Sequence, residues 1–568
     1  MPKNTKNLKA IQKRPPLQVR IPSGLDVDSL VPRTLKPAKR AKYIDGIRYF
    51  LDLLFPQAWD FKKHKQLSDS GYILLNSTEL KKVIGDEYLV IVDLLTIADV
   101  IKVDRQFIIG KHSRGYRITQ EYYRETVPVT VTDKGMCKRY WKREMETRQQ
   151  RAQSTSSIPF VTKWLDAKYI GIDLDGAHNF IETYREMMLE KWRDYRFRSD
   201  AKKTEAKYRI QNRCFYQRYI VAKIERGEIT FKRDDAGRLY SPFVHLKKEL
   251  RCFLTMGGKR LCSIDIKASQ PYFFQKLLDR RFWMTGASGG QTIYHLHKER
   301  YQQLQAGGNR KIIIEMLKNL EGEYGLGFGG IPFKNIRWED DFYEHLRSVV
   351  HEVSSDPKAL ASFRSRRKVK QTVMLLLYDN YEHKKPPYYG AFKKLFPEET
   401  KIMDAIKQAQ YKDVFPTILQ AVEANAVLDK ACKAINERYP SLPFVTIHDS
   451  VVCDYEYVDR VEQILKDTLH QIIGVVPGLK RELLDKETVV REIQKTVDDD
   501  WADVVYEIKK IAKKQDWVGS FNEDPKEIPL LGYIRYKGRL HLERRIAFPV
   551  FEQDYCNGEY SLASDGRE

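Results

Sequence analysis

The sequence predicts a mixed α+β protein of several domains, and three observations support that prediction. Two short apolar runs far apart in the chain each lead to an aspartate: Ser263–Phe274 reads SIDIKASQPYFF, and Pro443–Val452 reads PFVTIHDSVV. Both are typical of strands that end in an acid. Between them, stretches rich in good helix formers predict helices. The length of 568 residues exceeds the size at which one hydrophobic core stops growing, so about two to four domains are expected.

The composition favours a polyanionic partner. Lysine and arginine (99) outnumber aspartate and glutamate (77), a net charge of +22, and phosphates would give such a chain salt-sensitive affinity. Ribosomal or membrane-surface binding fits this charge too. The seven scattered cysteines include no C-x-x-C pair, which indicates neither zinc nor a disulfide framework but a reducing compartment. We expect a soluble, intracellular chain without a membrane partner, because no apolar run of about 18 residues and no signal peptide is present.

The N-terminal quarter is predicted to contain an arm and a small module. Residues 1–40 combine many lysines and arginines with several prolines, which predicts a flexible basic arm that contacts phosphates or is simply a solvated tail. Within residues 41–125, two short helices precede three short strands, an order that resembles a winged-helix module. Its basic, glycine-flanked loop at 110–115 suits a phosphate backbone, although winged helices also dock proteins.

Residues 126–235 are predicted to be helical and highly charged. Runs such as Lys138–Arg143, KRYWKR, interleave cations with aromatic rings, as nucleic-acid tracks do. For most of these residues a helical bundle with solvated basic faces is the simpler interpretation.

The two aspartates at the ends of the apolar runs are candidate metal ligands. A buried acid is costly unless something pairs it, and Asp265 and Asp449 on neighbouring strands could clamp two divalent ions for nucleotidyl transfer. The alternative is that Asp265 caps a turn and that His448 and Asp449 form an ordinary hairpin tip.

A predicted helix at Arg364–Tyr378, RSRRKVKQTVMLLLY, presents a second candidate site. Arg366, Lys370, Met374 and Tyr378 recur every four residues and therefore share one helix face. Two cations one turn apart, followed by an aromatic ring, can hold a triphosphate at one end and a sugar and base at the other. The alternative is an amphipathic helix whose basic turn faces water.

The order of these segments resembles that of family A DNA polymerases and of single-subunit phage-type RNA polymerases. The run GRLYS at Gly237–Ser241, followed by the strand ending in Asp265, is similar to the segment around their first palm aspartate. Arg-x3-Lys-x7-Tyr in the predicted helix resembles their fingers motif, except that Asp379 replaces a usual glycine. The HDS run at 448–450 looks like the RNA polymerase form of their last motif.

The resemblance implies a right-hand polymerase with a palm at 236–285 and 416–480, fingers at 286–415, thumb-like helices at 126–235 and an extension at 481–568. It implies nucleoside triphosphates, a nucleic-acid template and a possible primer as partners. The implied roles are two Mg²⁺ or Mn²⁺ ions on Asp265 and Asp449, nucleotide binding by Arg366, Lys370, Tyr378 and Gln270, and primer or template contact by Arg238 and His448.

The residue five positions after Asp265 bears on sugar choice. Within this resemblance, the RNA enzymes have glycine there and the DNA enzymes a glutamate that excludes the ribose 2′-hydroxyl. Gln270 has nearly the volume of glutamate and could hydrogen-bond Tyr378, which favours DNA synthesis, whereas Met374 favours the RNA form and Pro271 departs from both. The alternatives are a single-subunit RNA polymerase or primase, and a non-catalytic replication-initiation or DNA-binding protein with a remnant palm.

Overall fold

The computed structural model describes residues 16–58, 72–103, 114–122, 124, 126–284, 291–296, 308–324, 333, 336–379, 385–408 and 414–518. Over these residues the chain is α+β, mostly helical, with small antiparallel sheets of two to four strands. It divides into two compact units: unit 1 comprises 1–147, 185–216 and 497–568, and unit 2 comprises 148–184 and 217–496. None of the helices found in the described ranges has both the length and the apolar character needed to cross a bilayer.

Unit 1 begins with a strand where the sequence predicted a flexible arm. β1 (Gln18–Pro22) pairs antiparallel with β5 (Thr126–Thr130). Leu17, Val19 and Ile21 are all buried. The prediction for residues 16–40 was therefore wrong, because the alternation of apolar and polar residues in LQVRIP outweighs the prolines and cations around it. Residues 1–15 lie outside the described part of the chain.

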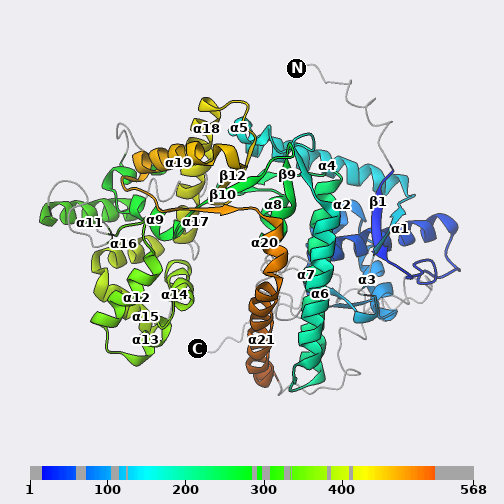
Figure 1. The fold of residues 1–568 in the computed structure, drawn as a ribbon. Helices are drawn as coiled ribbons and strands as arrows, with labels where there is room; N and C mark the ends of the chain where they lie inside the picture. The colour runs from blue at the N-terminus through cyan, green and yellow to red at the C-terminus, as the bar shows by residue number, and fades with distance from the viewer. Residues whose placement is uncertain are drawn as a thin grey trace, which may run out of the picture. The chain divides into compact units, whose positions relative to one another are not determined.

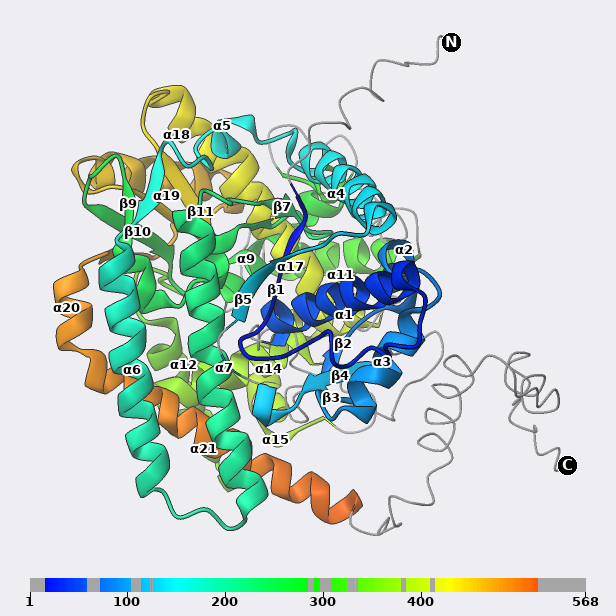
Figure 2. The ribbon, with the colours of Figure 1, turned by 90° about the vertical axis from the view of Figure 1, so that its right-hand side faces the viewer.

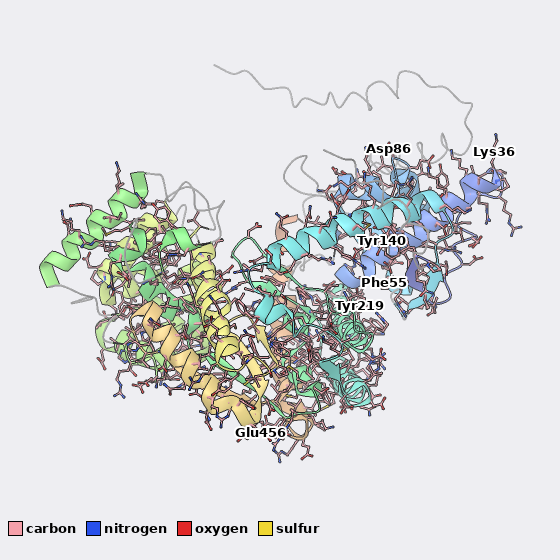
Figure 3. The ribbon with its side chains drawn as sticks, turned by 90° about the horizontal axis from the view of Figure 1, so that it is seen from above. Lys36, Phe55, Asp86, Tyr140, Tyr219 and Glu456 are labelled. Atoms are coloured by element: carbon pink, nitrogen blue, oxygen red, sulfur yellow. The ribbon has the colours of Figure 1, made fainter. Side chains whose placement is uncertain are left out.

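The predicted module forms a helix–strand–helix–helix–strand–strand succession in unit 1. Its sheet is antiparallel with the order β2-β4-β3. Asn76 caps the first short helix by accepting a hydrogen bond from the Thr78 amide at 2.8 Å. The strand predicted at 107–109 and most of the loop at 110–115 lie outside the described residues. The elements are α1 (Pro37–Ala58), β2 (Ile73–Leu74), α2 (Ser77–Val83), α3 (Tyr88–Ile97), β3 (Ile101–Val103) and β4 (Gly115–Ile118). Figure 3 labels Lys36, which precedes α1, and Phe55, which lies within it.

Four long helices contribute residues to unit 1: α4 (Lys134–Thr155), α6 (Leu174–Asp194), α7 (Asp200–Glu225) and α21 (Ile493–Val518). The predicted C-terminal extension begins in unit 2, and from residue 497 on it belongs to unit 1, where α21 lies beside α6 and α7 (Figures 1 and 2). Lys191 pairs with Asp498 at 2.6 Å, and Arg213 pairs with Asp500 at 3.0 Å. The Trp501 ring packs edge-on against Tyr195. The acidic run in α21 thus joins helices from distant parts of the chain.

The largest sheet of unit 2 has the order β11-β12-β10-β13 and is antiparallel throughout. Its strands β10 and β12 are labelled in Figure 1. It joins β10 (Leu261–Ile266) to strands from the far end of the unit: β11 (Phe444–Ile447), β12 (Ser450–Asp454) and β13 (Leu479–Leu483). The two apolar runs singled out in the sequence are therefore neighbouring strands. The apolar face of α19 (Val458–Ile473) is buried through Val461, Leu465 and Leu469, and this helix contacts β10 and β12.

Helices before, between and after these strands make up most of the rest of unit 2. An aromatic cluster around Phe333, with Phe274, Trp338, Phe342 and Phe396, packs several of them together. The helices are α5 (Pro159–Thr162), α8 (Pro242–His245), α9 (Ser269–Leu277), α11 (Gly308–Tyr324), α12 (Phe342–Val353), α13 (Pro357–Ser362), α14 (Arg366–Tyr378), α15 (Pro387–Leu395), α16 (Pro397–Lys407), α17 (Val414–Ala424), α18 (Cys432–Arg438) and α20 (Lys486–Arg491). A π-helical segment, Asn425–Ala431, joins α17 to α18.

Two short ribbons complete unit 2. β6 (Ile170–Ile172) pairs with β9 (Leu254–Met256), and β7 (Lys232–Arg233) pairs with β8 (Leu239–Tyr240). The second ribbon carries the Gly237–Arg238 turn that the sequence assigned to primer or template contact.

Candidate active site

Asp265 and Asp449 come together through strand register. Asp265 lies opposite Ser450 in the β10–β12 ladder, so Asp449 is the next residue along the partner strand. The β11–β12 hairpin turns through His448 and Asp449 alone, with His448 in the left-handed region at φ 57°. The Ser450 hydroxyl donates to the Ile447 carbonyl at 2.9 Å and closes this turn.

The surroundings of Asp265 make its negative charge unfavourable. The pKa of Asp265 is raised to about 7, mainly by burial and in addition by the neighbouring Asp449, while Lys370 opposes the rise. Within the described residues, neither carboxylate has a hydrogen-bond or ion-pair partner. The two half-buried carboxylates thus lie side by side, and no cationic side chain of the described residues contacts them. A bound cation would stabilise this arrangement.

The donor set fits a hard divalent cation. Carboxylate oxygens are the ligands that Mg²⁺ and Mn²⁺ prefer, and Mg²⁺ is often held by only one or two carboxylates together with water and substrate phosphates. In the part of the chain that the structure describes, no cluster of three or more His, Cys, Asp or Glu residues could hold a metal by itself. The two aspartates therefore suit ions shared with a substrate rather than a closed protein site.

Helix α14 has its basic turn exposed and its apolar side buried. Ser365 caps its first turn. Val369, Val373 and Leu377 face the interior, whereas Arg366 and Lys370 are exposed. Lys370 is near enough to Asp265 to lower the pKa of that aspartate. On the predicted face, Arg366 and Lys370 are therefore exposed, whereas Met374 and Tyr378 are partly buried.

Arg366 is oriented by a neighbouring helix that the sequence did not single out. Its Nε donates to Asp341 Oδ2 at 2.5 Å, and its guanidinium lies 5.6 Å from the centre of the Tyr343 ring. Asp341 is also the N-cap of α12. The negative charges of Asp449 and Asp265 contribute to raising the pKa of Tyr343, after burial as the main cause. These effects connect the start of α14 to the two aspartates.

Gln270, Tyr378 and Arg238 belong to one hydrogen-bonded chain. The Tyr378 hydroxyl donates to Gln270 Oε1 at 3.2 Å, which is the bond expected from the sequence. Gln270 Nε2 donates in turn to Glu423 Oε2, and Arg238 Nη2 donates to the same oxygen at 2.6 Å. Gln420 Nε2 approaches the Tyr378 hydroxyl at 3.4 Å. The chain links α9, α14 and α17.

Glu423 is a site residue that sequence reasoning missed. Its side chain is 1% exposed, and burial raises its pKa to about 8, with Asp449 adding to the rise and Arg238 opposing it. Pairing with Glu423 raises the pKa of Arg238. The available signal was an acid within FPTILQAVEANAVL, an otherwise apolar helical stretch, since such an acid needs a buried partner.

The turn that carries Arg238 is fixed by buried polar contacts. Arg233 Nε donates to the Gly237 carbonyl at 2.7 Å, while its two Nη groups reach Asp429 in the π-helical segment at 2.8 and 3.1 Å. Gly237 has φ 85°, in the left-handed region that residues with a Cβ atom rarely adopt. Arg238 therefore faces the buried Glu423. The predicted contact residue His448 packs its ring against Tyr240 at 5.5 Å.

A cavity of about 1010 Å³ adjoins the same turn. Arg233, Gly237, Asn425 and Asp429 line it together with residues from 150–160 and 294–296. Neither metal-ligand candidate lines this cavity, so we place the candidate chemistry at the exposed ends of β10 and β12 instead, where the unpartnered carboxylates are.

A search of solved structures finds a distant similarity to a family A polymerase domain. The match is the POL domain of Pol1 from M. smegmatis, solved in complex with a DNA primer-template and dNTP, with 10% sequence identity and a TM-score of 0.24. It covers 56% of this chain and 67% of that one. No protein-family model and no curated protein matches the sequence. At this TM-score the superposition is too loose to argue function, which has to be argued from the site residues.

Proposed function

We propose that the chain is a template-directed nucleotidyltransferase that uses two metal ions and favours DNA synthesis. The observation that supports this most strongly is the pair of half-buried, unpartnered carboxylates, Asp265 and Asp449, with Lys370 of α14 close to them. A pair of structural acids would be expected to have protein donors, as most buried polar groups do.

Each side chain in this proposal has a role that follows from its chemistry. Bound divalent ions would activate the primer hydroxyl and stabilise the leaving phosphate. Asp265 and Asp449 hold those ions, and their mutual repulsion favours cation binding. Arg366 and Lys370 attract the triphosphate from successive turns of α14. Tyr378, two turns further on, borders the sugar.

In this proposal, Gln270 selects the sugar of the incoming nucleotide. Its side chain is 5% exposed and is hydrogen-bonded to Tyr378, so it occupies volume that a ribose 2′-hydroxyl would need. Arg238 and His448 stand near the primer end in this proposal, and the winged-helix-like module and other basic regions of unit 1 contact nucleic-acid phosphates.

RNA synthesis, by a single-subunit RNA polymerase or primase, is the second candidate. The observation in its favour is Ser450, whose hydroxyl closes the β11–β12 turn at the position where the DNA enzymes of the resembled family usually have glutamate. A non-catalytic DNA-binding protein is the third candidate, and total inactivity of the purified chain would favour it.

The test is an extension assay that crosses DNA and RNA templates with dNTPs and NTPs, with and without a primer. We expect Mg²⁺-dependent extension of a primed template by dNTPs. Asp265→Asn and Asp449→Asn should each reduce it by orders of magnitude while leaving the fold intact, because the amide keeps the size but loses the charge that holds the ions. Asp454→Asn is the control, since Asp454 lies at the far end of β12 and only caps the following turn. Near-normal extension by both active-site variants would refute the proposal.

A further inference from the structure

The carboxylate of Glu423 touches the residue to which sugar selection is assigned. Its Oε2 accepts hydrogen bonds from Gln270 and from Arg238. Its other oxygen, Oε1, has no hydrogen-bond partner among the described residues. Whether or not Oε1 carries a proton, Oε2 remains an acceptor for both donors. Both of these hydrogen bonds of Glu423 are thus made with residues of the candidate site, Gln270 and Arg238.

The side-chain amide of Gln270 is held at both of its ends. Its Oε1 accepts from the Tyr378 hydroxyl, and its Nε2 donates to Glu423. Rotation of the amide would break at least one bond in a place where water does not replace the missing partner, at a cost of about 1–3 kcal/mol. The two hydrogen bonds therefore fix the position of the Gln270 side chain.

This arrangement also restricts which residue can stand at position 270. A glutamate there would place an acceptor oxygen opposite Glu423 Oε2, where the amide now presents a donor. Two buried acceptors cannot satisfy each other unless they share a proton. Arg238 cannot resolve the conflict, because its Nη2 is already directed at Glu423. Position 270 consequently requires one donor and one acceptor, which an amide supplies.

We propose that Glu423 is a positioning residue for sugar selection: it fixes Gln270 and dictates that residue 270 is an amide rather than an acid. This inference rests on the proposed polymerase function. It makes residues 270 and 423 a matched pair, in which an amide on one side requires an acid on the other.

A swap of the acid and the amide tests the proposal. The proteins compared are wild type, Gln270→Glu, Glu423→Gln and the double variant, each assayed for kcat/KM with dNTP and with NTP on a primed template. Gln270→Glu should lower dNTP use by about tenfold, the equivalent of about 1.4 kcal/mol for opposed buried acceptors, and should raise the NTP share. The double variant should recover the dNTP-to-NTP ratio to within about threefold of wild type, because donor and acceptor are exchanged between residues 270 and 423. Its kcat/KM for dNTP should recover only in part, because Arg238 donates to the same oxygen of Glu423 and loses that buried acidic partner.

Glu399→Gln is the matched control. Glu399 is another buried glutamate of unit 2, with 0% exposure, and among the described residues its Oε1 accepts from the Phe333 amide alone. Combined with Gln270→Glu, it should rescue nothing. Equal rescue by Glu399→Gln, or a double variant as poor as Gln270→Glu alone, would overturn the pairing.

Thermal unfolding gives a second readout that does not depend on catalysis. Gln270→Glu should lower Tm, and adding Glu423→Gln should restore part of the loss, the remainder being the cost of removing the acidic partner of Arg238. If Tm is restored while the dNTP-to-NTP ratio is not, Glu423 is a packing partner and its role in selection is refuted. If wild type incorporates no nucleotide at all, the polymerase proposal fails, and the Tm series still decides whether the two residues are matched.

Discussion

At the scale of single residues, the burial of Asp265 lowers the stability of the chain at neutral and alkaline pH. Its pKa is about 7 in the folded chain against an ordinary value of 3.8. As pH rises from about 3.8 to 7, an unfolded chain releases this proton before the folded chain does. The unfolded state then binds fewer protons, so the free energy of unfolding falls across this window. The loss is complete above pH 7, where the site would operate with its aspartates ionised.

Asp265→Asn should therefore stabilise the chain at alkaline pH. At pH 8 in EDTA we expect the variant to exceed wild type by about 1–2 kcal/mol, after allowing for solvent screening of a half-buried group. At pH 4 the two proteins should unfold alike. Mg²⁺ should raise the Tm of wild type and leave that of the variant almost unchanged, since a ligand stabilises only the state that binds it. A variant no more stable than wild type at pH 8 would contradict this account.

Lys370→Ala should weaken nucleotide binding more than nucleic-acid binding. The substitution removes an exposed charge near Asp265, so we expect KM for the incoming nucleotide to rise about tenfold or more, as the removal of a charge-assisted hydrogen bond would produce. Steady-state kinetics and a duplex-binding titration measure the two effects separately. Lys368→Ala, the same change on another face of α14, should alter neither by more than about twofold. Equal losses in both assays would place Lys370 on the nucleic-acid surface instead.

At the scale of elements, the π-helical segment Asn425–Ala431 connects the Arg238 turn to the rest of unit 2. It presents Asp429 to Arg233, whose side chain is 4% exposed. Asp429→Ala should destabilise unit 2 by about 3–5 kcal/mol, because it leaves a buried guanidinium unpaired. Urea unfolding measures the loss. Glu437→Ala in α18 is the control: its pair with Lys433, at 3.8 Å, is solvent-exposed and should contribute less than about 1 kcal/mol.

Some of these elements could be predicted from patterns in neighbouring residues, whereas others depend on information that such local patterns do not contain. Helix α14 and the β11–β12 hairpin were predictable, because the periodicity of RRKVKQTVMLLLY and the short apolar runs around His448–Asp449 are local patterns. The π-helical segment was not, since its residues suit an α-helix equally well. Glu423 was missed for another reason: an acid in an apolar helix indicates a buried partner, but only the tertiary structure shows that the partners are Gln270 and Arg238.

At the scale of the whole molecule, the basic N-terminal stretch is the simplest place to test the polyanion prediction. Deleting residues 1–15 removes Lys3, Lys6, Lys9, Lys13 and Arg14 and spares β1. Non-specific DNA affinity should fall, and the slope of log K against log salt should become shallower by up to about 0.9 for each phosphate that the protein no longer neutralises. Fluorescence anisotropy at several salt concentrations measures both. An unchanged slope would show that this stretch is a solvated tail.

Both units are assembled from separated stretches of chain. Unit 2 needs residues up to 496, and unit 1 combines its N-terminal part with 185–216 and with the last described helix from residue 497 on. Among the described residues, no cut in the middle of the chain would leave either unit whole, so the domain boundaries predicted from the sequence do not mark independently folding fragments.

The position of β10 inside the sheet has a consequence for synthesis. Its two partners, β12 and β13, lie about 185 and 215 residues further along the chain. At ribosomal speeds of about 5–20 residues per second, the strand that carries Asp265 waits roughly ten to forty seconds before either partner emerges. During that time its apolar residues and both hydrogen-bonding edges are open to other nascent chains. A gene fragment ending between these strands should therefore yield aggregates, and its complement should rescue solubility only when both halves are translated together.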